Sequence, residues 1–198
     1  MTTDDTAPPS PPSMHERWPA RLTPRARALQ WLLLDVDGVL TDGRLWFDDE
    51  GESVKVFDVR DGLGIKLLQA SGIQVGILSA RKSLIVEKRA RDLGLTELLQ
   101  GEENKLASFR AFLERHRLEA SAVAYLADDL LDLAVLAACG LSSAPADAVD
   151  EVRQRVDYVT TAGGGRGAVR ELAERILVAR GSWNAIVARY IAGARPDA

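Results

Sequence analysis

The chain has 198 residues, of which 46% are hydrophobic and 27% charged, the balance of a soluble globular domain with a core of its own. Its 25 basic and 29 acidic residues give a net charge of −4, and without a basic block this argues against a nucleic-acid partner. No apolar run approaches the roughly 20 residues that span a bilayer, so no membrane partner is expected either. Cys139 is the only cysteine, and the N-terminal segment lacks the apolar core of a secretory signal, which together predict a cytoplasmic protein.

The first 20 residues are predicted to form a disordered tail. Four prolines between positions 8 and 12, which lack an amide hydrogen, stand among serine, threonine and aspartate, and such a segment cannot build a packed element. The remainder shows no internal repeat. We therefore expect one domain over residues 21–180 and a C-terminal tail or helix over 181–198, whose apolar residues recur at helical spacing.

From residue 31 onward, apolar runs alternate with helical patterns. The runs have the continuous hydrophobic character of strands that are covered on both faces of a sheet. Strands are predicted at 31–36, 73–79, 122–127 and 157–161, and helices at 62–71, 82–93, 104–116, 130–139 and from Gly167. This alternation predicts an α/β fold with a doubly wound parallel sheet and right-handed crossovers.

One segment, residues 43–58, interrupts the alternation. Its two β-rich runs, RLWF and SVKVF, flank an acidic turn that contains a glycine, which predicts a protruding β-hairpin. A lone two-stranded hairpin is only marginally stable in water. Its apolar side chains therefore need a surface to pack against, and a neighbouring subunit is a natural candidate.

Charged and polar side chains follow the ends of the predicted strands. Because ligands bind at the carboxyl ends of strands in open α/β sheets, we expect these side chains to converge on one edge. They are Asp35 and Asp37 after the first strand, Ser79 and Arg81 after the second, Lys105 at the start of a helix, and Asp128, Asp129 and Asp132 after the third. For Asp132, a solvated charge on a helix face is an equally good interpretation.

The chemistry of these residues fits phosphoryl transfer. A carboxylate can attack phosphorus and form an aspartyl phosphate, and a second carboxyl group two residues along an extended chain can protonate the leaving alkoxide. A phosphate ester brings about two negative charges to a site already rich in carboxylates. A hard cation with oxygen ligands, most naturally Mg²⁺, and the ammonium of Lys105 would restore the balance, while Ser79 offers a hydroxyl to a phosphoryl oxygen.

Over most of residues 31–180, the chain resembles the haloacid-dehalogenase superfamily of phosphatases. The four motifs of that superfamily are matched in order by Asp35-x-Asp37-Gly-Val, Ser79, Lys105 and Asp128-Asp129. The stretches LDVDGVLTDG, VKVFDVRDGLGIKLL, QGEENK and DYVTTAGGGRGAVRE more closely resemble one family, the 3-deoxy-D-manno-octulosonate 8-phosphate phosphatases. The resemblance implies a Mg²⁺-dependent phosphatase that supplies the eight-carbon sugar acid of lipopolysaccharide. It also implies a homotetramer.

By this resemblance Asp35 is the nucleophile and Asp37 the general acid and base. The metal ligands would be Asp35, the carbonyl of Asp37 and Asp128, with Asp129 and Lys105 as charged support and Ser79 on the phosphate. Many relatives carry a cap domain, but here residues 38–78 have room only for the hairpin and one helix, and 80–104 only for one helix and a short strand. We therefore expect a cap-less fold with an open site, which a neighbouring subunit covers.

Two positions depart from the family pattern. Ala127 stands where glycine usually precedes the paired aspartates, and Ser79-Ala80-Arg81 stands where Thr-Gly-Arg is common. The hydroxyl and the guanidinium are retained at the second position. Both departures bear on the rate of turnover more than on the type of reaction.

Three arginines are candidates for binding the carboxylate of an acidic sugar, because a planar guanidinium matches two oxygens at once. They are Arg60, Arg81 and Arg89. An ordinary surface charge is an equally good interpretation for Arg60 and Arg89, whereas Arg81 directly follows a site segment, which favours a functional role. Arg81 and Arg89 are eight residues apart, just over two helical turns, so they are expected to share one helix face.

Other interpretations remain open. The same motif residues would serve a phosphatase for a nine-carbon acid sugar phosphate. A receiver domain has similar residues, but there the acidic pair comes first and the lysine last, whereas here Lys105 precedes the pair at 128–129. A catalytically inactive phosphate-binding relative would not need the full set of catalytic and metal-binding residues that this chain has. The run GGGRGA fits a dinucleotide pattern, but no strand follows it, so a loop near the site that carries Arg166 is the better interpretation.

Overall fold

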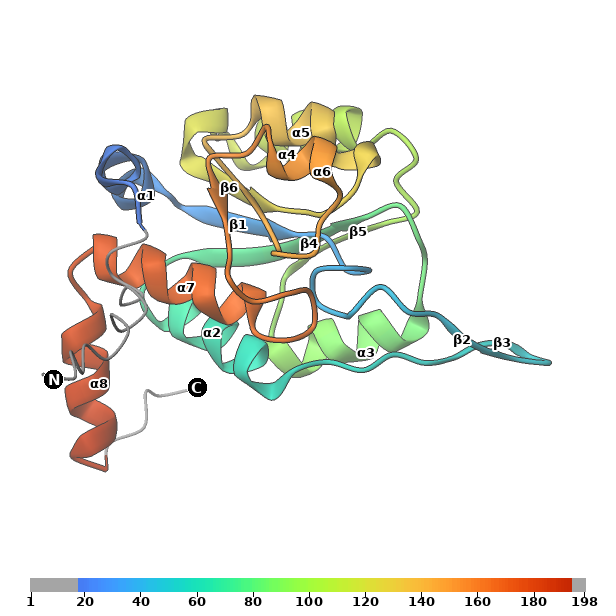
Figure 1. Cartoon of the computed structure of the whole chain (residues 1–198), viewed down its shortest axis with the longest axis horizontal. Helices are drawn as coiled ribbons and strands as arrows, with labels where there is room; N and C mark the ends of the chain where they lie inside the picture. Colours follow the sequence, from blue (N-terminus) through green and yellow to red (C-terminus); the bar gives the residue numbers. More distant parts are fainter. Residues whose placement is uncertain (1–17, 194–198) are drawn as a thin grey trace, which may run out of the picture.

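The computed structural model describes residues 18–193 and shows a central sheet of six parallel strands (Figure 1). The strands are β1 (Trp31–Leu34), β4 (Gln74–Ser79), β5 (Glu97–Gln100), β6 (Val123–Leu126), β7 (Leu141–Ala144) and β8 (Tyr158–Val159). Their order is β5-β4-β1-β6-β7-β8, so β1 pairs with β4 on one side and with β6 on the other. The direction of winding reverses beside β1, and in doubly wound sheets ligands bind at that point.

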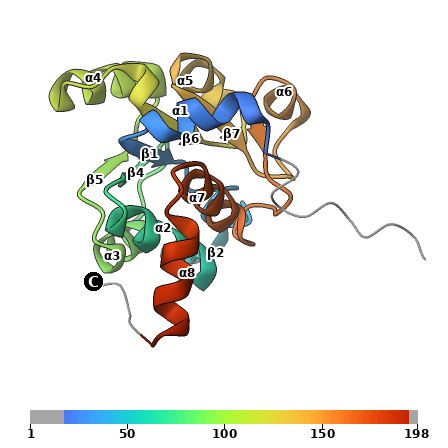
Figure 2. The ribbon, with the colours of Figure 1, turned by 90° about the vertical axis from the view of Figure 1, so that its left-hand side faces the viewer.

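Helices cover both faces of this sheet (Figures 1 and 2). One layer holds α2 (Val59–Ala70), α3 (Leu84–Leu93) and α7 (Ala168–Ala179), and α1 (Thr23–Ala28) packs against α7. The other layer holds α4 (Lys105–His116), α5 (Leu133–Ala138) and α6 (Asp150–Arg153). Short 3-10 turns, η2 (Ala20–Leu22), η3 (Ala120–Ala122) and η4 (Leu130–Asp132), precede α1, β6 and α5, and α8 (Trp183–Ile191) packs on α7 beyond the sheet.

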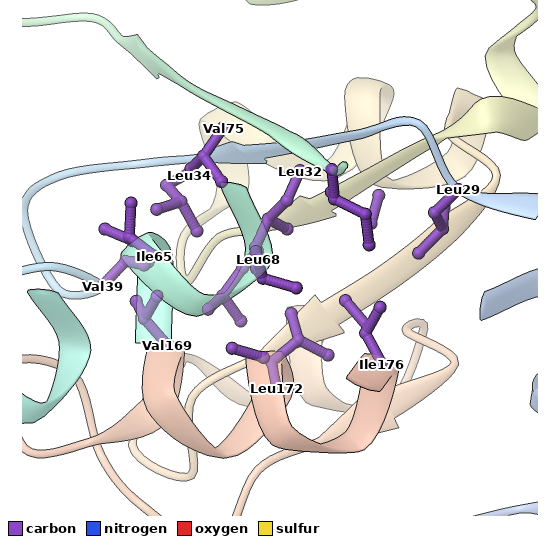
Figure 3. Packing of buried hydrophobic residues seen from close by; sticks show 14 of the residues in the cluster. Leu29, Leu32, Leu34, Val39, Ile65, Leu68, Val75, Val169, Leu172 and Ile176 are labelled. Carbon is purple, nitrogen blue, oxygen red and sulfur yellow. The ribbon is translucent and has the colours of Figure 1, made fainter. Parts of the chain in front are cut away.

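The two faces of β1 contact two separate hydrophobic cores. Leu32 and Leu34 point to the α2 and α7 side, while Trp31 and Leu33 point to the α4 and α5 side. Figure 3 shows the first core, in which Leu68 of α2 and Leu172 of α7 lie beneath the strands. Coverage on both faces explains why the run WLLL is apolar at every position.

The hairpin forms a sheet of its own. Strands β2 (Trp46–Asp48) and β3 (Gly51–Val54) pair antiparallel and project from one end of the domain (Figure 1). Trp46 is 58% exposed and Phe47 61% exposed. Within the described chain the hairpin and α2 are the only regular elements between β1 and β4, and no cap domain is inserted there.

The predicted fold class, a doubly wound parallel sheet with a protruding hairpin, is confirmed. Strand β7 and the short helix α6 were not predicted from the sequence. The predicted tail of residues 1–20 lies mostly outside the described residues, but Trp18 packs on Tyr158 with ring centroids 5.0 Å apart, so the packed fold includes residues before 21. Helix α8 accounts for most of the described part of segment 181–198. Among residues 18–193, no helix combines the length and the apolar character needed to cross a membrane.

Candidate active site

The carboxyl ends of β1, β4 and β6 meet around a pocket of about 170 Å³. Because β1 lies between β4 and β6, the residues that follow the three strands face the same edge of the sheet. The pocket is lined by Asp35, Asp37, Ser79, Ala80, Arg81, Lys105, Asp128, Asp129, Leu131 and Asp132. The strand-end residues singled out in the sequence therefore do lie together.

A buried lysine joins two of the carboxylates. The Lys105 ammonium donates to Asp35 Oδ2 at 2.8 Å and to Asp132 Oδ1 at 2.6 Å. The Tyr125 hydroxyl, which is fully buried, donates to the same oxygen of Asp132 at 2.5 Å. Asp35 itself is held by the amide of Val36, which donates to Oδ1 at 2.7 Å. Asp132 is thus part of the buried site, and the alternative of a solvated helix-face charge is wrong.

Burial and mutual repulsion set the charge state of these groups. Burial, with the charge of Asp132, raises the pKa of Asp35 to about 6 even though Lys105 opposes the shift. Burial, then the charges of Asp35 and Asp132, raise the pKa of Asp128 to about 8. Burial disfavours the charged form of Lys105, but the two carboxylates outweigh it and its pKa is raised. The pocket therefore carries more carboxylate than one ammonium balances.

The same carboxylates offer a set of oxygens for a hard cation. One oxygen from each of Asp35, Asp128 and Asp132 lies within 4.8 Å of the others. The Oδ1 atom of Asp128 is buried and accepts no hydrogen bond from residues 18–193. A buried carboxylate oxygen without a donor is costly unless a cation approaches it. All three groups are oxygen donors, which suits Mg²⁺.

Glycines shape the loop between the two aspartates and the hairpin. Gly38 has φ +84°, and a Cβ there would lie 2.0 Å from Asp128 Oδ2. The glycine-rich loop at 163–165 packs onto this loop, since the Gly165 amide donates to the Val39 carbonyl at 2.9 Å. A Cβ at Gly164 would lie 1.9 Å from the Gly38 carbonyl oxygen. The glycine run therefore supports the nucleophile loop by close backbone packing.

Asp37 lies beside a second charged network that includes the stem of the hairpin. Its Oδ1 pairs with the ammonium of Lys55, whose side chain is 1% exposed. Arg81 Nε lies 3.4 Å from Asp37 Oδ2, and Lys55 lies 2.9 Å from Glu52 Oε1. Neither Lys55 nor Glu52 was singled out in the sequence.

The remaining motif residues have distinct surroundings. Ser79 is buried, and its Oγ accepts from the Arg81 amide at 3.4 Å. Asp129 is exposed and caps η4, since its Oδ1 accepts from the Leu130 amide at 2.7 Å. The methyl group of Ala127 is fully buried in the core on the α4 side, so the departure from glycine is accommodated by packing.

The three candidate arginines do not lie together. Arg81 lines the pocket, but α3 begins at Leu84, so the expectation that Arg81 and Arg89 share a helix face is wrong. Arg89 lies over the Phe57 ring, with its Cζ 5.6 Å from the centroid, and is not among the lining residues. Arg60 pairs with Asp58 at 2.6 Å and donates to the Arg166 carbonyl at 3.1 Å. Their assignment to substrate binding stays a prediction.

Comparison with known proteins gives a consistent set of relatives, although no family model matches the chain. The 3-deoxy-D-manno-octulosonate 8-phosphate phosphatase KdsC of Escherichia coli K12 is 46% identical over 157 residues, which cover 79% of this chain and 84% of that protein.

Two solved structures are similar in both sequence and fold. The 3-deoxy-D-manno-octulosonate 8-phosphate phosphatase from Moraxella catarrhalis, in complex with magnesium ion, phosphate ion and KDO, superposes with a TM-score of 0.83 at 36% identity, covering 86% of this chain and 98% of the other. The cobalt-bound deoxy-D-mannose-octulosonate 8-phosphate phosphatase YrbI from Haemophilus influenzae gives 0.78 at 43% identity, covering 80% and 93%.

Proposed function

The chain belongs to the 3-deoxy-D-manno-octulosonate 8-phosphate phosphatase family of the haloacid-dehalogenase superfamily, and from this premise we propose that it hydrolyses that sugar phosphate to the free sugar acid and inorganic phosphate, with Mg²⁺ as cofactor. The observation that carries the proposal is the buried pair of Asp35 and Lys105 beside Asp128 at the strand ends. Asp35 placed in this way contacts a cation, which it shares with Asp132, and lines the pocket into which a phosphate ester would enter.

In the first half of the reaction, an Asp35 carboxylate oxygen attacks the phosphorus and the bond between phosphorus and the sugar oxygen breaks. Asp37, in its acid form, donates its proton to the departing alkoxide, which leaves as the sugar hydroxyl. The products of this half are the free sugar acid and a phosphoryl group on Asp35. Asp37 is then a carboxylate, poised to act as a base.

In the second half, the Asp37 carboxylate takes a proton from a water molecule, whose oxygen attacks the phosphorus. The bond from phosphorus to Asp35 breaks, inorganic phosphate leaves and Asp35 is regenerated. Ser79 and Lys105 hold phosphoryl oxygens through the hydroxyl and the ammonium that line the pocket. Every proton is accounted for by Asp37 and one water.

The residues at the strand ends fit a magnesium ion. Asp35, the carbonyl of Asp37 and Asp128 would hold it, with the exposed Asp129 as charged support beside them. Bound Mg²⁺ supplies positive charge that neutralises the phosphoryl oxygens. Asp132 contributes an oxygen close to those of Asp35 and Asp128, but it is already bonded to Lys105 and Tyr125, so we assign it to positioning the lysine.

We further propose a homotetramer in which the hairpin of one subunit docks on its neighbours. The exposed Trp46 and Phe47 support this, because large apolar side chains on a lone hairpin are unfavourable in water. The size of the pocket also supports a homotetramer. Its volume of about 170 Å³ is below the range of roughly 300–1,000 Å³ that encloses most small ligands, so a neighbouring subunit is needed to complete the walls around the sugar. Sedimentation at micromolar concentration should give the tetramer mass, and a W46K/F47K variant should sediment as a smaller species.

The cytoplasmic location stays part of the proposal. A single cysteine fits a reducing compartment, and the substrate is a charged metabolite rather than a membrane component. Fractionation of cells that express the chain at its natural level should place it with cytoplasmic markers.

The decisive experiment is a phosphate-release screen over sugar phosphates, with Mg²⁺ and with a chelator. We expect the eight-carbon acid sugar phosphate to be hydrolysed fastest and only with the metal, and Asp35→Asn to abolish release while the thermal unfolding curve stays cooperative. Faster turnover of a nine-carbon acid sugar phosphate would favour that alternative. Wild-type rates in a folded Asp35→Asn protein would refute the nucleophile assignment.

A further inference from the structure

A buried lysine in the stem of the hairpin has no role in the reaction described above. Lys55 follows β3, and its neighbours Val54 and Val56 are exposed, yet its own side chain is almost fully buried. Its stem turns inward, and its ammonium pairs with Asp37 Oδ1 and lies 2.9 Å from Glu52 Oε1. Removing a lysine ammonium from water costs free energy, and a lysine is therefore buried only where carboxylates compensate its charge.

The contacts of Asp37 single out Lys55. Its other charged neighbour is Arg81, whose Nε lies 3.4 Å from Oδ2 and whose side chain is 45% exposed. Asp37 Oδ2 is buried and accepts no hydrogen bond from residues 18–193. The ammonium thus holds one oxygen of the carboxyl group and leaves the other without a hydrogen bond, in a residue that lines the pocket where a proton must pass to the leaving group.

Lys55 is itself held in place by a second set of contacts. Glu52, which it contacts, accepts from the Ser83 hydroxyl through Oε2 at 2.5 Å. The amide of Ser83 in turn donates to the side-chain carbonyl of Gln100, at the end of β5, at 2.9 Å. The lysine therefore stands in a chain of contacts that runs from the edge of the sheet through Ser83 and Glu52 to Asp37. A long flexible side chain fixed in this way can set the orientation of the group that it contacts.

We propose that Lys55, held by Glu52, is a positioning residue that orients the carboxyl group of Asp37 for proton transfer to the leaving group. This inference rests on the proposed function, because it assigns Asp37 to that transfer. Among residues 18–193, Lys55 forms ion pairs with Asp37 and Glu52 and none with Asp35, so an effect on the reaction should pass through Asp37.

The leaving group supplies the test. A poorly basic nitrophenolate departs without much help, whereas a phenolate, with a conjugate acid of pKa about 10, and still more a sugar alkoxide need a proton. Values of kcat/KM should therefore be measured for para-nitrophenyl phosphate, phenyl phosphate and the acid sugar phosphate. In Lys55→Met we expect a loss of less than about 3-fold for the first and roughly 10- to 100-fold for the last, since general acid catalysis contributes about 10²- to 10⁴-fold. Phenyl phosphate should fall between them.

Two further variants make the result specific. Glu52→Gln keeps Lys55 but loosens it, so it should show the same dependence on the leaving group with a smaller loss, and it carries the test if Lys55→Met does not fold. Lys88→Met removes an exposed lysine of α3 and should match wild type on all three esters.

The outcomes separate the two claims. A loss that grows with the basicity of the leaving group supports the inference. Equal losses on all three esters, or no loss, with both folded variants would overturn it and leave the phosphatase assignment standing. A wild-type protein that releases no phosphate from any of the esters would refute the proposed function, and the inference with it.

Discussion

Asp35 and Lys105 are 70 positions apart in the chain, yet the lysine ammonium lies 2.8 Å from Asp35 Oδ2 inside the pocket. The same ammonium reaches Asp132 at 2.6 Å, so two buried carboxylates share one cation. This arrangement explains why the pKa of Lys105 is raised although burial works against its charge. The lysine offsets only part of the negative charge around the nucleophile, because it is shared with Asp132.

Replacing Lys105 by methionine should therefore damage both the fold and the chemistry. We expect the free energy of unfolding to fall by about 3–5 kcal/mol, as for other broken buried ion pairs. We expect kcat to fall roughly 10²- to 10³-fold, because a positive charge at the phosphoryl group is lost. Denaturant unfolding and phosphate-release kinetics measure the two effects.

A paired change separates stability from catalysis. In Lys105→Met with Asp132→Asn, the unpaired carboxylate is removed together with the lysine, so part of the lost stability should return while kcat stays low. A double variant that regains wild-type turnover would show that Lys105 acts only on the fold.

Magnesium binding should depend on pH. Burial raises the pKa of Asp35 to about 6 and that of Asp128 to about 8, so near pH 7 Asp128 carries a proton that the metal must displace. The dissociation constant should fall as pH rises from about 6 to about 8 and level off above that. Calorimetry at pH 7 in two buffers of different ionisation enthalpy should show proton release, and a titration that releases none would contradict the prediction.

Much of the fold was predictable because strands covered on both faces are uniformly apolar. The exception, β7, has the sequence LSSA, and its Ser142 hydroxyl donates to Asp157 at 3.0 Å. Because its two serines break the apolar run, β7 lacks the hydrophobic pattern by which the other strands were predicted. The same limitation applies in the site, because Lys55 occupies a hairpin position where a charged side chain normally faces solvent.

Residues linked through space rather than along the chain were the hardest to assign. Asp132 is held in the site by hydrogen bonds from Lys105 and from the fully buried hydroxyl of Tyr125. No pattern in the sequence indicates that the hydroxyl of a tyrosine in β6 contacts Asp132. The strand-end rule, in contrast, located Asp35, Asp128 and their neighbours because it depends only on topology.

Gly164→Ala should impair catalysis from outside the pocket. The added Cβ would lie 1.9 Å from the Gly38 carbonyl oxygen, so the loop after Asp35 must shift. We expect stability to fall by roughly 1–3 kcal/mol, as for an overpacked site, together with a lower kcat. Thermal unfolding and phosphate release on the same preparation would test both.

The control for this variant is alanine at Gly72 or Gly181. Both have positive φ, +82° and +77°, but a Cβ there meets nothing within 4 Å. Each should therefore cost only backbone strain, of roughly 1–2 kcal/mol, and leave kcat unchanged. If either control lowers kcat as much as Gly164→Ala, the loop contact is not the cause.

Substrate choice should depend on Arg81. Its guanidinium lines the pocket and is only loosely paired, 3.4 Å from Asp37 and 3.7 Å from Glu52, so it can turn to a sugar carboxylate. Losing one charge-assisted bond costs roughly 1.5–3 kcal/mol, so Arg81→Ala should lower kcat/KM for the acid sugar phosphate about 10- to 150-fold.

A neutral hexose phosphate is the control substrate, because it has the same kind of alkoxide leaving group as the acid sugar phosphate but lacks the carboxylate. Any effect that Arg81 exerts through Asp37 should therefore appear with both substrates, whereas the loss of a contact with the carboxylate should appear only with the acid sugar. We expect Arg81→Ala to lower its kcat/KM much less. Arg89, which lies over Phe57 and outside the pocket, is the matched comparison. If Arg89→Ala shows the same selective loss, Arg89 also binds the sugar acid, as the sequence analysis predicted, although the two arginines do not share a helix face. Equal losses on the acid and neutral sugars with Arg81→Ala would instead place that arginine at the phosphate or at Asp37.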